Sequence, residues 1–146
     1  MDGVIIPDLP PEEAKELIRF AKDKDISTIF LAAPTSIRKR IKMIAEKSTG
    51  FVYYVSLTGV TGARRELPLK VRSNVRMIKS MTNKPVAVGF GISNPKQARD
   101  IARIADGVIV GSAIVKIIAD SRKNYKAMIS KVSSFSKRLA GAIHDA

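Results

Sequence analysis

The sequence contains no cysteine, no tryptophan and a single histidine, and the missing residue types exclude whole classes of chemistry. Without cysteine, the chain of 146 residues cannot form a disulfide, a thiolate nucleophile or a cysteine-ligated metal site. His144 lies near the C-terminus and cannot build a histidine metal centre by itself. The composition therefore favours a cytoplasmic protein without a metal site.

Long hydrophobic runs are missing as well. The apolar segment at residues 3–6 is interrupted by Pro7 and Asp8, so it is too short for a signal peptide, and no stretch approaches the length of a membrane span. A chain of this length fits one domain, which hides roughly two thirds of its unfolded surface. We predict one soluble domain over residues 1–146 that does not enter a membrane.

Acidic residues are half as frequent as basic ones, 13 against 26, which gives a net charge of +13. A strongly basic chain can bind nucleic acid. Most of the basic residues, however, fall on the expected outer faces of helices, and no aromatic residues are interleaved with them to stack on bases. We interpret the charge as solvated helix faces that attract polyanions weakly, without specific recognition of nucleic acid.

Short apolar runs alternate with helical patterns from end to end. Strands are expected at residues 3–6, 28–32, 51–55, 86–88 and 107–110, and helices at 11–22, 36–47, 68–81, 95–104, 112–119 and 124–142. The strands are almost continuously apolar, which is typical of parallel strands covered on both faces. This pattern predicts an α/β array with its ligand site at the carboxyl ends of the strands.

Three helix starts carry recognisable signals. Glu12 and Glu13 suit the positive end of the first helix, and Thr35 or Ser36 is the expected cap of the second. Before the fourth helix, Asn94 is a plausible cap and the next residue is a proline, which suits a first helical position.

Two strands end in glycine and are followed at once by a helix. In "KPVAVGFGIS" the strand at 86–88 breaks at Gly89 and Gly91, and in "DGVIVGSAIVKII" the strand ends at Gly111 and a short helix starts at Ser112. Such turns bring bare backbone N–H groups together at a helix N-terminus, which suits an anion such as phosphate. Two adjacent turns of this kind predict a phosphate site.

The connection at residues 56–68, "SLTGVTGARRELP", is longer than the others. Long glycine-containing loops after a strand are usually functional in compact α/β arrays. Gly59 and Gly62 could act as hinges around Thr61, so that the loop behaves as a lid. The alternative is an ordinary mobile loop.

The ordered segments "DGVIIPDLPPEEA", "FLAAPTS", "GFVYYVSLTGVTGAR", "KPVAVGFGIS" and "ADGVIVGSAIVKII" resemble the C-terminal part of the tryptophan synthase alpha chain. The resemblance implies a (β/α)8 TIM-barrel fold, here a partial barrel of about five parallel strands with outer helices. It also implies retro-aldol cleavage of indole-3-glycerol phosphate to indole and glyceraldehyde 3-phosphate. The indole would pass to a tryptophan synthase beta subunit, which would hold pyridoxal phosphate, so this chain would need no cofactor.

The resemblance assigns the phosphate site to residues of the glycine turns and the long loop. Gly62, Gly91 and Gly111 would present backbone N–H groups to the substrate phosphate, and Ser112 would add its N–H and its hydroxyl.

The resemblance also implies roles for four individual residues outside the phosphate site. Tyr53 would line the indole and glycerol site, Thr61 would help to close it, and Phe90 would pack on the ligand. Asp8 would lie near the active site and take part in communication with the beta subunit. Tyr53 could instead be a core aromatic with its hydroxyl bonded to backbone, and Asp8 a turn or helix-capping residue. Leu57 departs from the polar or basic residue that several members of the family carry nearby.

The catalytic glutamate and aspartate of the family have no counterpart here, because the chain starts at what would be the fourth strand. We expect a fragment, a split-gene product, a misplaced start or an engineered piece. Glu12, Glu13 and Glu46 are expected on helix surfaces and Glu66 in the loop, so none is assigned to catalysis. The chain alone is therefore predicted to be inactive or nearly so.

Two further interpretations stay open. The chain could be a non-catalytic phosphate-binding half-barrel that assembles with another chain, or with itself, through open sheet edges. Another phosphate-binding barrel, such as an epimerase or a thiamin-phosphate synthase, would share the glycine turns. The loop sequence "YVSLTGVTGAR" does not support that last interpretation.

Overall fold

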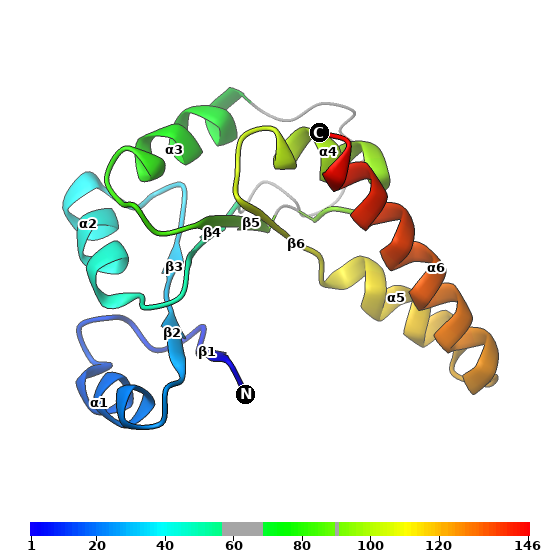
Figure 1. The fold of residues 1–146 in the computed structure, drawn as a ribbon, viewed down its shortest axis with the longest axis horizontal. Helices are drawn as coiled ribbons and strands as arrows, with labels where there is room; N and C mark the ends of the chain where they lie inside the picture. The colour runs from blue at the N-terminus through cyan, green and yellow to red at the C-terminus, as the bar shows by residue number, and fades with distance from the viewer. Residues whose placement is uncertain (57–68, 90) are drawn as a thin grey trace.

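Strands and helices alternate along the computed structural model, which describes residues 1–56, 69–89 and 91–146 (Figure 1). The elements are β1 (Gly3–Ile5), α1 (Lys15–Asp23), β2 (Ser27–Ile29), β3 (Leu31–Ala32), α2 (Arg38–Lys47), β4 (Val52–Val55), α3 (Leu69–Lys79), β5 (Val86–Gly89), α4 (Pro95–Ala102), β6 (Gly107–Ile109), α5 (Ser112–Ser121) and α6 (Tyr125–His144). The predicted α/β array is confirmed.

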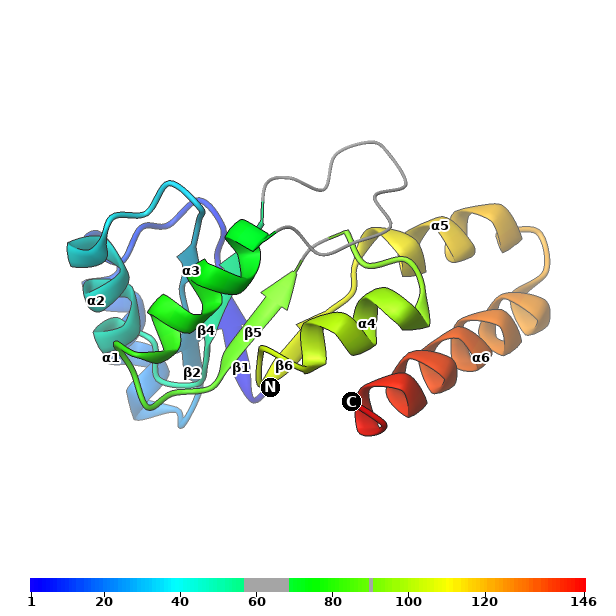
Figure 2. The same ribbon diagram turned by 90° about the horizontal axis from the view of Figure 1, so that it is seen from above.

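All strand pairs are parallel. One sheet has the order β3-β4-β5-β6, and β1 pairs with β2 in a second. Helices α1 to α4 follow one another along the outer side of this curved layer, and α5 and α6 form an antiparallel pair at its end (Figures 1 and 2). The molecule is an open arc of strands with helices on its convex side.

The strand expected at 28–32 is wrong as one continuous element, because it divides into β2 and β3 at Phe30. The backbone N–H of Phe30 donates to the hydroxyl of Ser48 (3.1 Å) instead of to a neighbouring strand. The carbonyl of Phe30 still accepts from the N–H of Tyr53 (3.1 Å), so the break affects one side of the strand only.

The core lies between the sheet and the outer helices. Val52 and Tyr54 of β4 are buried on this side, while Tyr53 and Val55, which alternate with them, are half-buried on the open side. The Asn74 amide of α3 donates to the Tyr54 hydroxyl (2.8 Å), and burial raises the pKa of Tyr54. The helices contribute the buried side chains Ile41, Ile44, Val71, Val75, Ile78, Ala98 and Ile101.

Two of the predicted helix starts are wrong. Helix α1 begins at Lys15, so Glu12 and Glu13 lie in the preceding turn, where Glu12 forms an ion pair with Arg40 of α2. The backbone of its own turn and the Arg40 guanidinium hold the pKa of Glu12 below its ordinary value. Glu12 therefore pairs with a residue of another helix and does not interact with the N-terminus of α1.

The expected cap of α2 by Thr35 or Ser36 is also wrong. The N-cap is Ile37, which makes no side-chain cap bond, and the Ser36 hydroxyl accepts from the N–H of Ala33 instead (3.0 Å). A local turn competes here for the same hydroxyl.

At α4 the prediction is confirmed. The Asn94 side chain accepts from the N–H of Gln97 (3.0 Å), and Pro95 is the first helical residue. Asn124 caps α6 in the same way through the N–H of Ala127 (3.0 Å). None of the described helices combines the length and apolar character that a membrane span requires.

Candidate functional site

The carboxyl ends of parallel strands lie at one edge of a sheet, where α/β proteins build their ligand sites. Strands β4, β5 and β6 bring Tyr53, Gly89 and Gly91 to this edge, followed by Gly111 and Ser112 at the start of α5. Thr61, Gly62 and Phe90, which were also predicted to bind, lie outside the described residues, as does Leu57.

Tyr53 lies against Gly89 of the neighbouring strand. A Cβ atom at Gly89 would come within 2.8 Å of Cε2 and 3.0 Å of Cζ of the Tyr53 ring, so any other residue there would require the ring to shift from this position. Within the described residues the Tyr53 hydroxyl has no hydrogen-bond partner, and the side chain is half-buried on the open face of the sheet. The backbone-bonded core aromatic that the sequence left open is therefore not seen in this part of the chain.

Sequence reasoning did not assign a role to Gly89 beyond breaking the strand. The strand register shows why Gly89 matters. Tyr53 pairs with Ala87 and Val55 pairs with Gly89, so Gly89 is the diagonal neighbour of Tyr53. An aromatic ring leaning along the strand reaches the diagonal neighbour, and that position must then be small.

The N-terminus of α5 is open. Gly111 is its N-cap and no side chain of the described residues caps it, while Ser112 is exposed at the first helical position. A Cβ atom at Gly111 would meet no atom within 4 Å. The folded chain therefore does not require glycine here, and the missing side chain leaves the backbone N–H groups accessible to a ligand.

The turn before α4 differs. Gly91 has φ 57°, a left-handed conformation that favours glycine. The N–H of Ser93 donates to the Gln97 side chain (2.9 Å), and the N–H of Gln97 donates to Asn94. Two N–H groups at this end are thus bound by side chains. At α5 the described residues bind only the N–H of Ile114 among the first three, through the Gly111 carbonyl (2.9 Å), so α5 offers the more open helix N-terminus.

Asp8 lies in the turn after β1 and is exposed. The N–H of Leu9 closes this turn on the carbonyl of Ile6 (3.2 Å). Strands β1 and β6 belong to different sheets, so the described strand pairing does not bring Asp8 to the start of α5.

Asp106 occupies the opposite, amino-terminal edge of the sheet. Its carboxylate accepts from Lys79 (2.6 Å) and from the N–H of Val86 (2.9 Å). Partial burial acts to raise the pKa of Asp106, but these donors outweigh it and the pKa is lowered. The described residues contain no cluster of three or more carboxylate or imidazole groups that could hold a metal ion.

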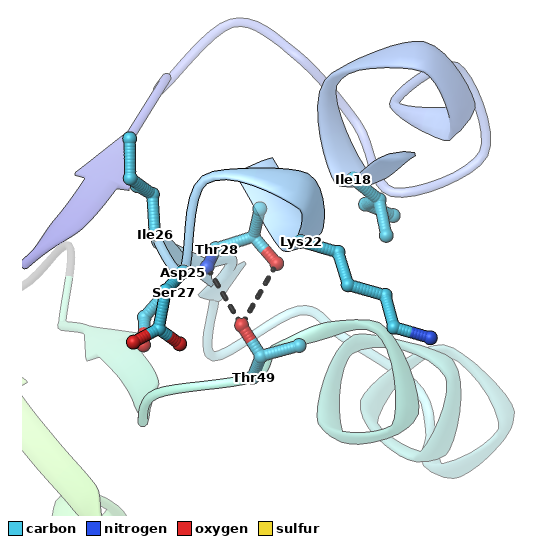
Figure 3. A pocket seen from close by; sticks show the side chains of 7 residues that line it. All are labelled: Ile18, Lys22, Asp25, Ile26, Ser27, Thr28 and Thr49. Atoms are coloured by element: carbon cyan, nitrogen blue, oxygen red, sulfur yellow. Dashed lines mark hydrogen bonds between the residues drawn. The ribbon is translucent and has the colours of Figure 1, made fainter. Parts of the chain in front are cut away.

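A cavity of about 220 Å³ also opens at the amino-terminal edge, beside the start of β2 (Figure 3). The N–H of Thr28 donates to the Thr49 hydroxyl (2.8 Å), and the Thr28 hydroxyl donates to the carbonyl of Lys47 (3.1 Å). These polar groups hold β2 to the end of α2. We interpret the cavity as a by-product of this structural contact.

The fold defines one class of protein: part of a (β/α)8 barrel, here with an uncapped helix N-terminus at the carboxyl edge of its strands. The family model described as tryptophan synthase alpha chain matches residues 1–144. The chain belongs to the tryptophan synthase alpha chain family.

Relatives and solved structures agree with this assignment. The tryptophan synthase alpha chain of Dehalococcoides mccartyi is 45% identical over 139 residues, which are 95% of this chain and 52% of the relative. That of Geobacter sulfurreducens is 54% identical over 117 residues, which are 80% of this chain and 44% of the relative. The chain therefore spans about half the length of the curated relatives it matches.

Two solved structures confirm the partial barrel. The tryptophan synthase α2β2 complex of Pyrococcus furiosus contains a chain that is 41% identical, with a TM-score of 0.84 over 97% of this chain and 56% of that one. The alpha subunit of Legionella pneumophila is 32% identical, with a TM-score of 0.84 over 99% of this chain and 53% of that one.

Proposed function

We propose that this chain supplies the phosphate-binding part of an enzyme of tryptophan biosynthesis. The reaction is retro-aldol cleavage of indole-3-glycerol phosphate to indole and glyceraldehyde 3-phosphate. The substrate phosphate binds at Gly111 and Ser112, Gly91 and Gly62 are further N–H donors to it, and Tyr53, Thr61 and Phe90 contact the rest of the substrate. The protein works in the cytoplasm, with no cofactor on this chain.

The open N-terminus of α5 is the observation that carries this proposal. The first N–H groups of a helix lack intrahelical partners, and the helix dipole adds positive potential at the same point. Gly111 leaves this end uncovered, and Ser112 adds a hydroxyl donor that is exposed. Such a site binds a phosphate group with or without the remainder of a substrate.

The phosphate site is tested with two glycine variants that the fold should tolerate equally. At both Gly111 and Gly141 a Cβ atom would meet no atom within 4 Å, but only Gly111 lies at the proposed site. Gly111→Ala should weaken inorganic phosphate binding by about tenfold, the equivalent of one impaired charged hydrogen bond. Gly141→Ala should leave the affinity unchanged. Equal affinity in Gly111→Ala and the unaltered chain, measured by calorimetry, would remove the phosphate from this helix.

Catalysis requires more than this site. Retro-aldol cleavage needs one group that protonates the indole ring and another that removes the glycerol hydroxyl proton. Glu12 is engaged with Arg40, Glu13 is exposed in the turn before α1, and Glu46 is exposed on α2, so we assign neither task to them. General acid and base catalysis contributes about 10²- to 10⁴-fold, so this chain alone should release indole at close to the background rate.

The catalytic part of the proposal is tested by adding a fragment with the family's N-terminal strands. Restored indole release would support it, whereas full activity of the 146 residues alone would contradict it and point to Asp8 as the proton-transfer group. We further propose that a tryptophan synthase beta subunit is the partner, because the similar chain of P. furiosus belongs to an α2β2 complex. Asp8, exposed after β1, is the residue we propose for communication with it.

A second candidate is a non-catalytic half-barrel that binds phosphate and assembles with another chain. The observation that favours it is the open face of the sheet, where Leu31, Tyr53, Val55 and Ile109 are only half-buried. The two candidates differ in the complementation experiment: a binding module would associate with the added fragment without releasing indole.

A further inference from the structure

Helices α2 and α3 together carry nine basic residues and one acidic residue, Glu46. The basic residues are Arg38, Lys39, Arg40, Lys42, Lys47, Lys70, Arg72, Arg76 and Lys79. This concentration accounts for most of the net charge of +13. We call the outward surface of these two helices the basic face.

The fold places the two helices beside each other on the convex side of the sheet (Figures 1 and 2). Ile44 of α2 and Val75 of α3 are fully buried in the same core, which turns the charged sides of both helices outward. The Lys84 ammonium, just before β5, donates to the carbonyls of Ala45 (2.5 Å) and Glu46 (3.4 Å) at the end of α2. It adds a further positive charge beside the basic face.

Most of these charges are not neutralised by neighbours. Arg40 pairs with Glu12, and Lys79 pairs with Asp106 (2.6 Å). No ion pair involves the other seven basic residues within the described part of the chain. Unpaired like charges on one face repel one another, so an anionic partner would stabilise this arrangement.

We propose that the basic face binds the phosphate backbone of duplex nucleic acid without reading its sequence. Neither helix carries an aromatic residue, so the face lacks the stacking platform on which single strands depend. Phosphate contacts from lysine and arginine are sufficient for sequence-independent binding to a duplex. This inference is independent of the proposed enzyme function.

Other anionic partners fit the basic face less well. A helix that lies on a membrane presents a row of large apolar side chains beside its lysines, whereas the large apolar residues exposed at these helices are Leu69, at the first position of α3, and Ile37, the N-cap of α2. Protein interfaces are depleted of lysine and depend on aromatic and apolar anchors. A lysine-rich, otherwise polar surface is typical of proteins that bind the phosphate backbone of nucleic acids.

The experiment compares two triple variants with the same net charge. Lys39→Gln, Lys42→Gln and Arg76→Gln remove three exposed charges from the basic face, and Lys116→Gln, Lys126→Gln and Lys137→Gln remove three exposed charges from α5 and α6. Glutamine has nearly the helix propensity of lysine and arginine, so both variants should fold, which circular dichroism checks. The probe is a mixed-sequence DNA duplex of about 20 base pairs, titrated by fluorescence anisotropy between about 50 and 200 mM salt.

The unaltered chain should bind the duplex with an affinity that falls steeply as salt increases. If each of the three residues contacts a phosphate, the slope of log affinity against log salt should become shallower by about 2.7 in the basic-face variant. The α5 and α6 variant should keep the slope of the unaltered chain. Equal losses in both variants, no binding at the lowest salt, or stronger binding to single strands or to anionic vesicles would each overturn the proposal.

Discussion

At the scale of single residues, the close contact between Tyr53 and Gly89 determines the shape of the candidate site. The ring occupies the space that any other side chain at position 89 would need. The aromatic surface that the proposed substrate would meet is therefore positioned by a glycine on the neighbouring strand.

Gly89→Ala should displace this ring and destabilise the fold by about 1–3 kcal/mol, the usual range for overpacking. Replacing Tyr53 with leucine in the same chain removes the colliding ring atoms, so the double variant should recover most of the loss. Chemical denaturation of the two single variants and the double variant measures this coupling. Additive effects of the two changes would show that the ring is free to move aside.

At the scale of elements, Asp106 joins three of them at the amino-terminal edge. Its carboxylate accepts hydrogen bonds from Lys79, at the end of α3, and from the N–H of Val86, at the start of β5. Asp106 itself directly precedes β6. Asp106→Ala should lower the free energy of unfolding by about 1–3 kcal/mol at neutral pH, because the buried N–H of Val86 loses its acceptor.

The loss should depend on pH with a defined sign. Lys79 and the N–H of Val86 hold the folded pKa of Asp106 below its ordinary value of 3.8, so the stabilisation is fully present above pH 3.8 and is lost as the pH falls through the folded pKa. The difference in unfolding free energy between Asp106→Ala and the unaltered chain should therefore shrink as the pH falls through the folded pKa of Asp106. Lys79→Gln is the matched control: it removes only a half-exposed ion pair and should cost less than about 1 kcal/mol.

The helix starts show which element-scale features a sequence predicts well. Asn94 and Pro95 act within one turn of chain, and the structure confirms both. Ser36 and Glu12 had equally suitable local patterns but bind elsewhere, to Ala33 and to Arg40. A cap can be predicted when no other partner competes for the same side chain.

At the scale of the whole molecule, the sheet is open. Strand β1 is an edge of the two-stranded sheet, β6 is an edge of the four-stranded sheet, and Ile109 of β6 is half-buried on the open side. Unpaired parallel edges with apolar side chains favour association with other strands.

We expect the isolated chain to form dimers or larger species at low micromolar concentration, as measured by sedimentation velocity. Ile109→Lys places a charge on the inward side of the edge strand and should shift the distribution toward monomer. A monomer with a sharp, cooperative melting transition for the unaltered chain would contradict this expectation.

The sequence by itself determined the order of strands and helices, the class of fold and the positions of the glycine turns at the ends of β5 and β6. These features depend on periodicity and on turn chemistry within a few residues, which act before any distant contact forms. The tertiary structure alone decided the break at Phe30, the contact of Tyr53 with Gly89 and the gathering of the α2 and α3 charges on one face. Each of these brings together segments that are distant in sequence, so it depends on strand register and helix placement, which only the packed core fixes.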